Sequence, residues 1–427
     1  MDKKLTIAII GLGSRGMHTY APALQNYADR AEIVAAADLR SANLKEFSER
    51  FHVPAERCFS SAEELLAQDK LADAVFICSQ DQDHVPHGLL ALEKGYHVLM
   101  EKPISPNPED CRKLLETANR NNRRVVVCHV LRYTPFYRKL KELISSGIIG
   151  EVVTLQALEN VGYWHQAHSF VRGNWRRSEE TSPMCLAKTC HDYDMYLWLA
   201  DKKPSLVTSF GNTFHFKPEC APAGAAKRCL DGCAAKENCP FDAEKIYITS
   251  KTTGVRNGKT GWPANVLALV PDEENIREAL EKGPYGRCVY YCDNNVVDHQ
   301  VTCILNTDGS TINFTMSGFS AADASRCCKV MGTKGELIGD MRKNTVEVVV
   351  YGQEREVIDI SKLSDDFSGH GGGDIRLVDA FLTLLETGKE TDGITTLEQS
   401  LDSHYVAFAA EESRLAGGMP VNIEKYI

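Results

Sequence analysis

The chain has 427 residues, 43% hydrophobic and 25% charged, which is the composition of a folded globular protein too long for one core. Its net charge of -10, from 48 basic and 58 acidic residues, argues against nucleic acid or an anionic membrane as a partner. The sequence shows no secretory signal pattern and no apolar run long enough to span a bilayer. Most of its 15 cysteines stand singly in apolar patterns, so a cytoplasmic protein is expected.

Residues 1–129 alternate short apolar runs with amphipathic stretches, the pattern of βα units around a parallel sheet. We expect strands at 5–10, 33–37, 74–78, 97–100 and 125–128. Helices are expected at 15–25, 41–50, 61–68, 85–94 and 108–121. This region is therefore predicted to form an NAD-binding Rossmann domain of the α/β class.

Residues 130–370 are predicted to form an α+β substrate domain. After a helix at 135–146, longer β-branched runs with turns at 306–309 and 332–335 indicate a large, mainly antiparallel open sheet. One helix interrupts it at 189–199, and the Gly-, Pro- and Cys-rich segment 217–241 is interpreted as an inserted loop. Residues 371–427 are predicted to form C-terminal helices that pack back on the body.

A glycine-rich turn follows the first predicted strand, with the spacing G-x-G-x-x-G. Its glycines permit a tight turn, let the backbone approach a diphosphate, and let the next helix pack closely. A carboxylate at Asp38 would accept bonds from ribose hydroxyls and repel a 2′-phosphate, which favours NAD over NADP, although Arg40 could accept that phosphate. The cofactor-binding residues predicted here are Gly11, Gly13, Ser14, Arg15, Gly16, Asp38 and Arg40.

A lysine stands at the end of the strand predicted at 97–100. The strand runs into Glu101-Lys102-Pro103, which places Lys102 at the carboxyl edge of the parallel sheet, where open α/β sheets bind ligands. The bond before Pro103 could be cis. The sequence therefore predicts a functional lysine near the cofactor turn.

With these motifs the sequence resembles the Gfo/Idh/MocA oxidoreductases, the family of glucose-fructose oxidoreductase and inositol 2-dehydrogenase. The resemblance covers nearly the whole chain. The resemblance rests on the following motifs: the glycine turn with Asp38, Ser79-Gln-Asp-Gln-Asp-His84, Glu101-Lys102-Pro103, Arg132-Tyr-Thr-Pro135 and His191-Asp-Tyr-Asp194. The resemblance implies that Ser79, His84, Glu101 and Lys102 lie on the ribose side of the cofactor.

The resemblance also implies that Lys102 faces the substrate hydroxyl beside the nicotinamide, with His191 as its acid/base partner. Oxidation of a carbinol carbon requires a positioned base for the hydroxyl proton. A neutral His191 could take that proton while the Lys102 ammonium stabilises the developing alkoxide. Alternatively Lys102 is the base, with a pKa lowered by burial. The sequence does not decide between them.

The helix that carries His191 departs from the family pattern. The family commonly has an aspartate one turn before the histidine, and the matching residue here is Ala187. Lys188, Thr189 and Asp192 supply the nearby polar groups, and Asp194 matches a second family acid with an expected structural role. What orients His191 is therefore left open.

The segment from Tyr163 to Arg176 is dense in aromatic rings, imidazoles and guanidiniums. Sugars stack on ring faces and pair with forked donors, so this segment is predicted to set specificity, and its arginines would also suit a carboxylate or sulfonate. The alternative is a surface loop anchored by a buried tryptophan. The predicted substrate-binding residues are Lys102, Arg132, Tyr163, Trp164, His168, Arg172, Trp175, Lys188 and His191.

Three cysteines, Cys229, Cys233 and Cys239, lie close together in the segment 217–241. They could bind a structural zinc ion with a fourth ligand not identified, or remain free reduced thiols. Near the C-terminus, His370-Gly-Gly-Gly-Asp374 could approach the active site, but we interpret it as the start of a helix.

The leading hypothesis is reversible NAD-dependent oxidation of one secondary hydroxyl of a sugar, sugar acid or cyclitol. A second hypothesis is a glycoside hydrolase or lyase that oxidises the sugar transiently and recycles NAD. A third is a non-catalytic, NAD-sensing protein, against which the presence of both Lys102 and His191 counts. The resemblance favours a homodimer or homotetramer formed through the second-domain sheets.

Overall fold

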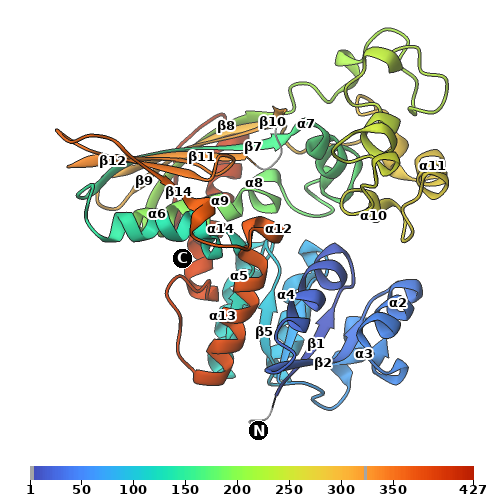
Figure 1. Ribbon diagram of the computed structural model, residues 1–427, viewed down its shortest axis with the longest axis horizontal. Coiled ribbons are helices and arrows are strands. Elements are labelled where there is room, and N and C mark those ends of the chain that lie inside the picture. Colours follow the sequence, from blue (N-terminus) through green and yellow to red (C-terminus); the bar gives the residue numbers. More distant parts are fainter. Residues whose placement is uncertain (1–3, 322–324) are drawn as a thin grey trace.

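The computed structural model describes residues 4–321 and 325–427 in two sheet-centred layers joined by helices (Figure 1). The first sheet has six parallel strands in the order β3-β2-β1-β4-β5-β6. Its strands are β1 (Leu5–Ile10), β2 (Ala31–Ala37), β3 (Cys58–Phe59), β4 (Ala74–Ile77), β5 (His97–Met100) and β6 (Val125–Val127). This confirms the predicted parallel α/β sheet.

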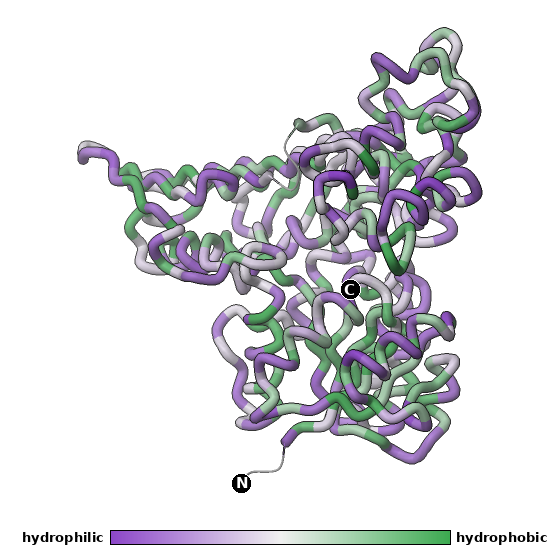
Figure 2. Tube along the Cα trace, turned by 45° about the vertical axis from the view of Figure 1, so that its right-hand side comes forward, coloured by the Kyte–Doolittle hydropathy of each residue, from purple (hydrophilic) through white to green (hydrophobic). Residues whose placement is uncertain are grey.

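Helices cover both faces of the first sheet because successive strand residues point to opposite sides. Ile7 and Ile9 of β1 face one apolar cluster, and Ala8 and Ile10 face the other. The helices around this sheet are α1 (Ala21–Gln25), α2 (Ser41–Phe51), α3 (Ala62–Ala67), α4 (His84–Glu93), α5 (Pro108–Arg120) and α13 (Gly373–Thr387). Figure 2 shows hydrophobic segments gathered inside this half and hydrophilic ones mostly around it.

The second sheet has nine strands in the order β14-β13-β12-β11-β7-β10-β9-β8-β15, antiparallel except for the β7/β10 pair. Its long strands are β7 (Val152–Gly162), β8 (Pro204–Asn212), β9 (His299–Asn306), β10 (Thr311–Ser320) and β11 (Ser325–Gly332). Its short strands are β12 (Gly335–Asp340), β13 (Thr345–Val350), β14 (Glu356–Asp359) and β15 (Val421–Asn422). The predicted mainly antiparallel sheet and its two turns are confirmed.

One face of the second sheet packs on helices, and the other remains open. The covering helices are α6 (Pro135–Ser145), α9 (Cys190–Ala200) and α14 (Leu397–Leu415). On the open face Val153, Phe210, Val301 and Leu305 are exposed. In the described part of the chain, no helix has the length and apolar character needed to cross a membrane.

The segment between β8 and β9 is longer and more helical than the sequence suggested. We expected an inserted loop at 217–241, but all of 213–298 lies outside the sheet and has its own apolar cluster. It contains α10 (Ala264–Leu267) and α11 (Glu273–Lys282). The signals for α11 were present: Asp272 caps the Asn275 N–H, and Ile276 and Leu280 are one helical turn apart. In Figure 1 this insertion extends away from both sheets.

Candidate active site

The glycine turn lies between β1 and the helical segment that continues into α1. Gly11 has a φ of +88°, and a Cβ there would lie 2.5 Å from the Cys78 carbonyl oxygen. A Cβ on Gly16 would lie 2.1 Å from the Gly11 oxygen, whereas nothing lies within 4 Å of a Cβ on Gly13. Gly11 and Gly16 therefore permit close packing, and Gly13 leaves the backbone open to a ligand.

Asp38 stands at the end of β2 and faces this turn. Its Oδ2 accepts from Leu12 N at 2.7 Å, and its Oδ1 accepts from Arg40 N at 2.8 Å. The buried Asn43 donates to Leu12 O at 3.0 Å, a contact that sequence reasoning missed although a polar residue on a buried helix face was its signal. The Arg40 side chain is 63% exposed and its Nε lies 3.5 Å from Asp38 Oδ1. The turn thus presents a fixed negative charge.

Arg15, in the glycine turn, forms ion pairs with the carboxylates of Glu101 and Asp374. It donates from Nε to Glu101 Oε1 at 2.5 Å and from Nη2 to Asp374 Oδ1 at 2.8 Å. The Tyr20 hydroxyl also donates to Glu101 Oε1, and Lys102 N to its Oε2. Burial raises the pKa of Glu101, but Arg15 and Lys102 more than offset it and the net shift is downward. Glu101 is therefore an anion that links the glycine turn to the lysine strand.

His84 connects the loop after β4 to the turn after β5. Its ring nitrogens lie 2.6 Å from Pro103 O and 3.0 Å from Ser79 O, and the residue is 1% exposed. Ser79 Oγ lies 3.0 Å from His87 Nδ1. Both nitrogens of His84 thus face protein carbonyls, and its contact with the cofactor stays a prediction.

Lys102 reaches from the first sheet to the second domain. Its Nζ donates to the carbonyl oxygen of Ala187 at 2.6 Å, and Ala187 ends the short helix α8 (Met184–Ala187). The Lys102–Pro103 bond is cis, as the sequence allowed. The backbone at Ala187, where the family commonly has an aspartate, thus supplies the partner of the lysine.

Three imidazoles from distant segments meet near Lys102. The ring centroid of His191, in the first turn of α9, lies 5.6 Å from that of His129 and 6.2 Å from that of His370. His191 Nδ1 and both His129 nitrogens are enclosed without a hydrogen-bond partner among the described residues. Burial, followed by the charge of Lys102, lowers the pKa of His191 well below 6.5. His191 is therefore neutral at pH 7.

Sequence reasoning missed His129 and the part played by His370. His129 follows β6 and so lies at the same carboxyl edge of the sheet as Lys102, a signal that could have identified it. For His370 we preferred the start of a helix over an approach to the active site, but its ring lies against His191, with its Nδ1 3.0 Å from Asp374 Oδ2. Packing between distant segments brings His370 to His191, and the local sequence around His370 carries no signal for this contact.

Lys188 belongs to a buried charge network under His191. Its Nζ lies 3.4 Å from Glu159 Oε1, and Arg326 Nε lies 2.9 Å from Glu159 Oε2 and 2.7 Å from Asp192 Oδ1. Two cations thus alternate with two anions, as buried charges require. The network fixes the start of α9, and the Lys188 side chain keeps 14% exposure.

Three predicted substrate residues are committed to protein partners. Arg132, 5% exposed, forms a bidentate pair with Asp194 at 2.6 and 2.7 Å. His168, 2% exposed, bonds Tyr247 at 2.8 Å, and Arg172 is 1% exposed inside the insertion. Packing encloses these three side chains, and their contact with a substrate stays a prediction.

Tyr163 and Trp164 remain half-buried at the end of β7. Their rings pack on Phe241 at 6.0 Å and on Trp262 at 5.1 Å. Trp175 instead donates from Nε1 to the buried Asp81 at 3.0 Å. The accessible aromatic surface therefore lies between β7 and the insertion.

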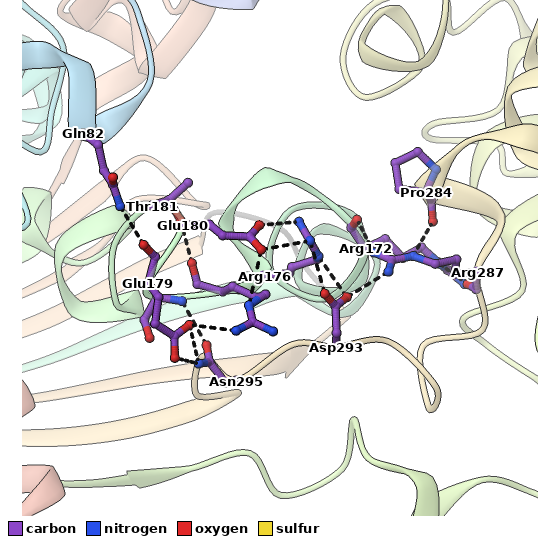
Figure 3. Close-up of polar contacts among 12 residues, drawn as sticks. Gln82, Arg172, Arg176, Glu179, Glu180, Thr181, Pro284, Arg287, Asp293 and Asn295 are labelled. Carbon is purple, nitrogen blue, oxygen red and sulfur yellow. Dashed lines mark hydrogen bonds and ion pairs between the residues drawn. The ribbon is translucent and has the colours of Figure 1, made fainter.

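Residues 172–181 connect three parts of the molecule (Figure 3). Gln82, on the cofactor loop, donates to Glu179 O at 2.7 Å, and Arg176 donates to Asp293 of the insertion at 2.9 Å. Asn295 donates to the Glu179 carboxylate. The insertion is thereby tied to the loop beside the cofactor turn.

The predicted zinc site is not supported. Within residues 4–321 and 325–427, no three His, Cys, Asp or Glu side chains are close enough together to hold one metal ion. Cys229 Sγ accepts from Arg172 Nη2 at 3.6 Å and from Ala243 N at 3.4 Å. The thiols of Cys233 and Cys239 do not join it in a tetrahedral set.

Comparisons with known proteins agree with the fold and the cofactor turn. Residues 5–129 match the model described as "Oxidoreductase family, NAD-binding Rossmann fold", and residues 141–423 match "Oxidoreductase family, C-terminal alpha/beta domain". YteT of Bacillus subtilis (strain 168), named as an oxidoreductase, is 24% identical over 88% of each chain.

Two relatives with more specific names match over shorter stretches. Inositol 2-dehydrogenase of Corynebacterium glutamicum (strain R) is 28% identical over 48% of this chain and 56% of its own length. D-glucoside 3-dehydrogenase of Escherichia coli (strain K12) is 30% identical over 37% of this chain and 44% of its own. These matches therefore span about half of each relative.

Solved structures share the whole architecture. An oxidoreductase from Agrobacterium radiobacter, solved with NAD+, L-tartaric acid and magnesium, has a TM-score of 0.69 at 16% identity over 100% of both chains. An oxidoreductase domain protein from Kribbella flavida has a TM-score of 0.72 at 15% identity over 99% of each. At these identities the likeness shows the fold. The two family models, matched over residues 5–129 and 141–423, show that the chain belongs to the Gfo/Idh/MocA oxidoreductase family.

Proposed function

We propose that this protein is an NAD-dependent dehydrogenase that oxidises one secondary hydroxyl of a sugar, sugar acid or cyclitol. The observation that carries the proposal is that Lys102 Nζ, bonded to Ala187 O just before the helix of His191, lies close enough to the buried His191 for its charge to lower the pKa of that imidazole. The relatives named inositol 2-dehydrogenase and D-glucoside 3-dehydrogenase support a polyhydroxylated substrate.

The residues of the first sheet fit a dinucleotide. The open backbone at Gly13 leaves room for a diphosphate, and Asp38 sets a carboxylate beside it. Bound there, NAD would accept or return the hydride. The Asp38 charge favours NAD over NADP, and the exposed Arg40 side chain lies 3.5 Å from that carboxylate.

The surroundings of Lys102 favour His191 as the base. Lys102 Nζ already donates to the Ala187 carbonyl, and an ammonium group has further N–H donors for a substrate oxygen. An ammonium can hold the substrate oxygen and stabilise alkoxide charge, while the neutral His191 takes the hydroxyl proton.

His129 takes the positioning role that an aspartate has in much of the family. His191 Nδ1 needs an acceptor when it carries the proton, and the His129 ring lies 5.6 Å away, nearly perpendicular. A direct bond or one bridging water would pair nitrogens that otherwise remain unsatisfied. His129 then fixes the tautomer in which His191 Nε2 accepts a proton.

We also propose a homodimer or homotetramer in the cytoplasm. The exposed apolar residues on the open face of the second sheet support an interface between copies, and fifteen free cysteines support a reducing compartment. Light scattering on the wild type and on Val301→Glu tests the interface, which predicts a smaller assembly for the variant.

A substrate screen tests the proposed activity. Sugars, uronates and inositols are incubated with NAD, and NADH is followed for the wild type, for Lys102→Met and for the exposed-lysine control Lys113→Met. We expect turnover with at least one compound, loss of turnover in Lys102→Met, and wild-type rates in the control. Aglycone release without net NADH, or full activity in Lys102→Met, would contradict the proposal.

A further inference from the structure

The glycine-rich loop before α13 brings a solvent-exposed histidine against the buried His191. The loop includes α12 (Ser368–Gly371), which lies between the two sheets in Figure 1. A Cβ on Gly373 would lie 2.3 Å from the Val130 carbonyl oxygen, so a glycine there lets the loop pack closely on the segment after β6. The His370 side chain keeps 45% exposure, and its ring centroid lies 6.2 Å from that of His191. His370 therefore borders both the histidine site and the solvent.

The site has to release one proton in each turnover. In the dehydrogenase proposed above, on which this inference rests, His191 takes that proton from the substrate hydroxyl. Burial, and then the charge of Lys102, lower the pKa of His191 well below 6.5. The other basic groups that lower it are His129, His370 and Arg326. Because the imidazolium is disfavoured there, the proton has to leave His191 before the next turnover.

The branch through His129 ends inside the protein. The His129 ring centroid lies 5.6 Å from that of His191 and 5.7 Å from that of His404. His404 is fully buried, its Nε2 accepts from Ile104 N at 2.8 Å, and its Nδ1 lies 2.9 Å from Ser400 O. Burial lowers the pKa of His404 to about 3. A proton on His404 would thus be unfavourable and enclosed.

His370 has the partners of a proton acceptor. Its Nδ1 lies 3.0 Å from Asp374 Oδ2, and Oδ1 of the same carboxylate accepts from Arg15 at 2.8 Å. Burial raises the pKa of Asp374, but the charges of Arg15 and His370 more than offset it, and the net shift is well downward. An anionic carboxylate at Nδ1 keeps the proton on that nitrogen, leaves Nε2 as the acceptor, and stabilises the imidazolium that forms.

We propose that His370 relays the substrate proton from His191 to the solvent. The hydroxyl O–H bond breaks and an N–H bond forms at His191 Nε2, while the hydride leaves the carbon separately with its two electrons. Rings with centroids 6.2 Å apart are too far for a direct hydrogen bond, so one water accepts this proton and gives one of its own to His370 Nε2. His370 then releases a proton to bulk water. Both imidazoles end neutral, and one proton appears in solution for each hydroxyl oxidised.

The experiment follows NADH and released protons together in a stopped-flow instrument. The full chain is mixed with NAD and a substrate found in the screen, in weak buffer above neutral pH with an indicator dye. In the wild type we expect proton release to keep pace with NADH. In His370→Gln the first turnover should form NADH at the wild-type rate, because His191 starts neutral. Proton release and kcat should then fall about tenfold, less than on loss of the base itself, with kcat/KM unchanged.

Imidazole rescue separates a relay from a structural role. In His370→Ala, added imidazole should restore proton release and kcat, because a free base takes the place of the missing ring. The matched control is His299→Ala, since His299 is 42% exposed and its Nδ1 lies 2.9 Å from Asp298 Oδ1, as His370 does from Asp374. The control should behave as the wild type does, with and without imidazole.

Three results would overturn the relay. These are proton release without a lag in His370→Gln, imidazole that restores nothing in His370→Ala, and a lag of the same size in His299→Ala. A wild type that forms no NADH with any sugar, uronate or inositol contradicts the proposed dehydrogenase itself. NADH formation in the wild type thus distinguishes failure of the relay from failure of the proposed function.

Discussion

The cofactor turn and the histidine site differ in how completely their polar groups are paired. Around Asp38 both carboxylate oxygens accept backbone N–H groups, and Asn43 closes the contact to Leu12. Around His191 the enclosed Nδ1 and both nitrogens of His129 have no partner among the described residues. The polar groups around Asp38 are thus paired within the protein, whereas those around His191 and His129 are not.

This difference follows from where the residues come from. The turn is built by neighbouring βα units, so its hydrogen bonds form when the first sheet folds. The histidine site joins β5, β6, α9 and the segment before α13, so its polar groups come together only through packing between distant segments. We therefore expect mutations in the first region to change cofactor choice and mutations in the second to change the chemical step.

The largest effect is expected for His191→Asn. Loss of a general base typically lowers rate by about 10²- to 10⁴-fold, so kcat should fall by that factor. NAD affinity, measured by fluorescence titration, should change little because His191 does not contact the turn. A variant that kept its kcat and lost NAD binding would reverse the assignment of the two regions.

Asp38→Asn should change cofactor discrimination. Removing charge-assisted hydrogen bonds worth about 1.5–3 kcal/mol should raise KM for NAD roughly 10- to 100-fold. KM for NADP should fall, since its 2′-phosphate is no longer repelled. The ratio of kcat/KM for the two cofactors is the measurement, and an unchanged ratio would remove Asp38 from the ribose site. Thermal melting controls for damage to the turn.

His129→Phe should have a smaller effect than His191→Asn. The ring volume is kept but the acceptor for His191 Nδ1 is lost, and we expect kcat to fall about tenfold, the scale of one hydrogen bond. His129→Asn should recover part of that loss, with KM unchanged in both variants. Equal kcat values for the Phe and Asn variants would indicate packing without a positioning role.

The smallest effect concerns pH. Burial, and then the charge of Lys102, lower the pKa of His191, so kcat/KM should stay high below pH 6.5 and fall only in more acid solution. His370→Ala removes a neighbouring basic group that also lowers the pKa of His191, so the acid limb should move to higher pH. Movement to lower pH would contradict this electrostatic account.

The first sheet and the cofactor turn could be predicted from sequence because their signals are local. Glycine spacing, the acid after β2 and the lysine after β5 all lie within short βα units. Lys102 was predicted because ligands bind at the carboxyl ends of parallel strands, and the same argument could have identified His129. The contact of His370 with His191 could not be predicted in this way, because only tertiary packing brings the two rings together.

Three of the predicted substrate-binding residues show what composition leaves out. Arg132, His168 and Arg172 have the donors that sugars need, yet folding buries each of them on protein partners. Donor type can be read from sequence, but burial of a long side chain depends on what packs over it. The helix α11 lies outside the cysteine-rich segment 217–241, and its signals, the Asp272 cap and the spacing of Ile276 and Leu280, are local.

Deuterium transfer tests the central claim most directly. A substrate found in the screen is labelled at the carbon that bears the reacting hydroxyl, and the nicotinamide product is analysed by mass spectrometry. The account predicts one deuterium transferred to NAD for each sugar oxidised by the wild type and none in Lys102→Met. Oxidation without deuterium in the reduced cofactor, or undiminished transfer in Lys102→Met, would contradict it.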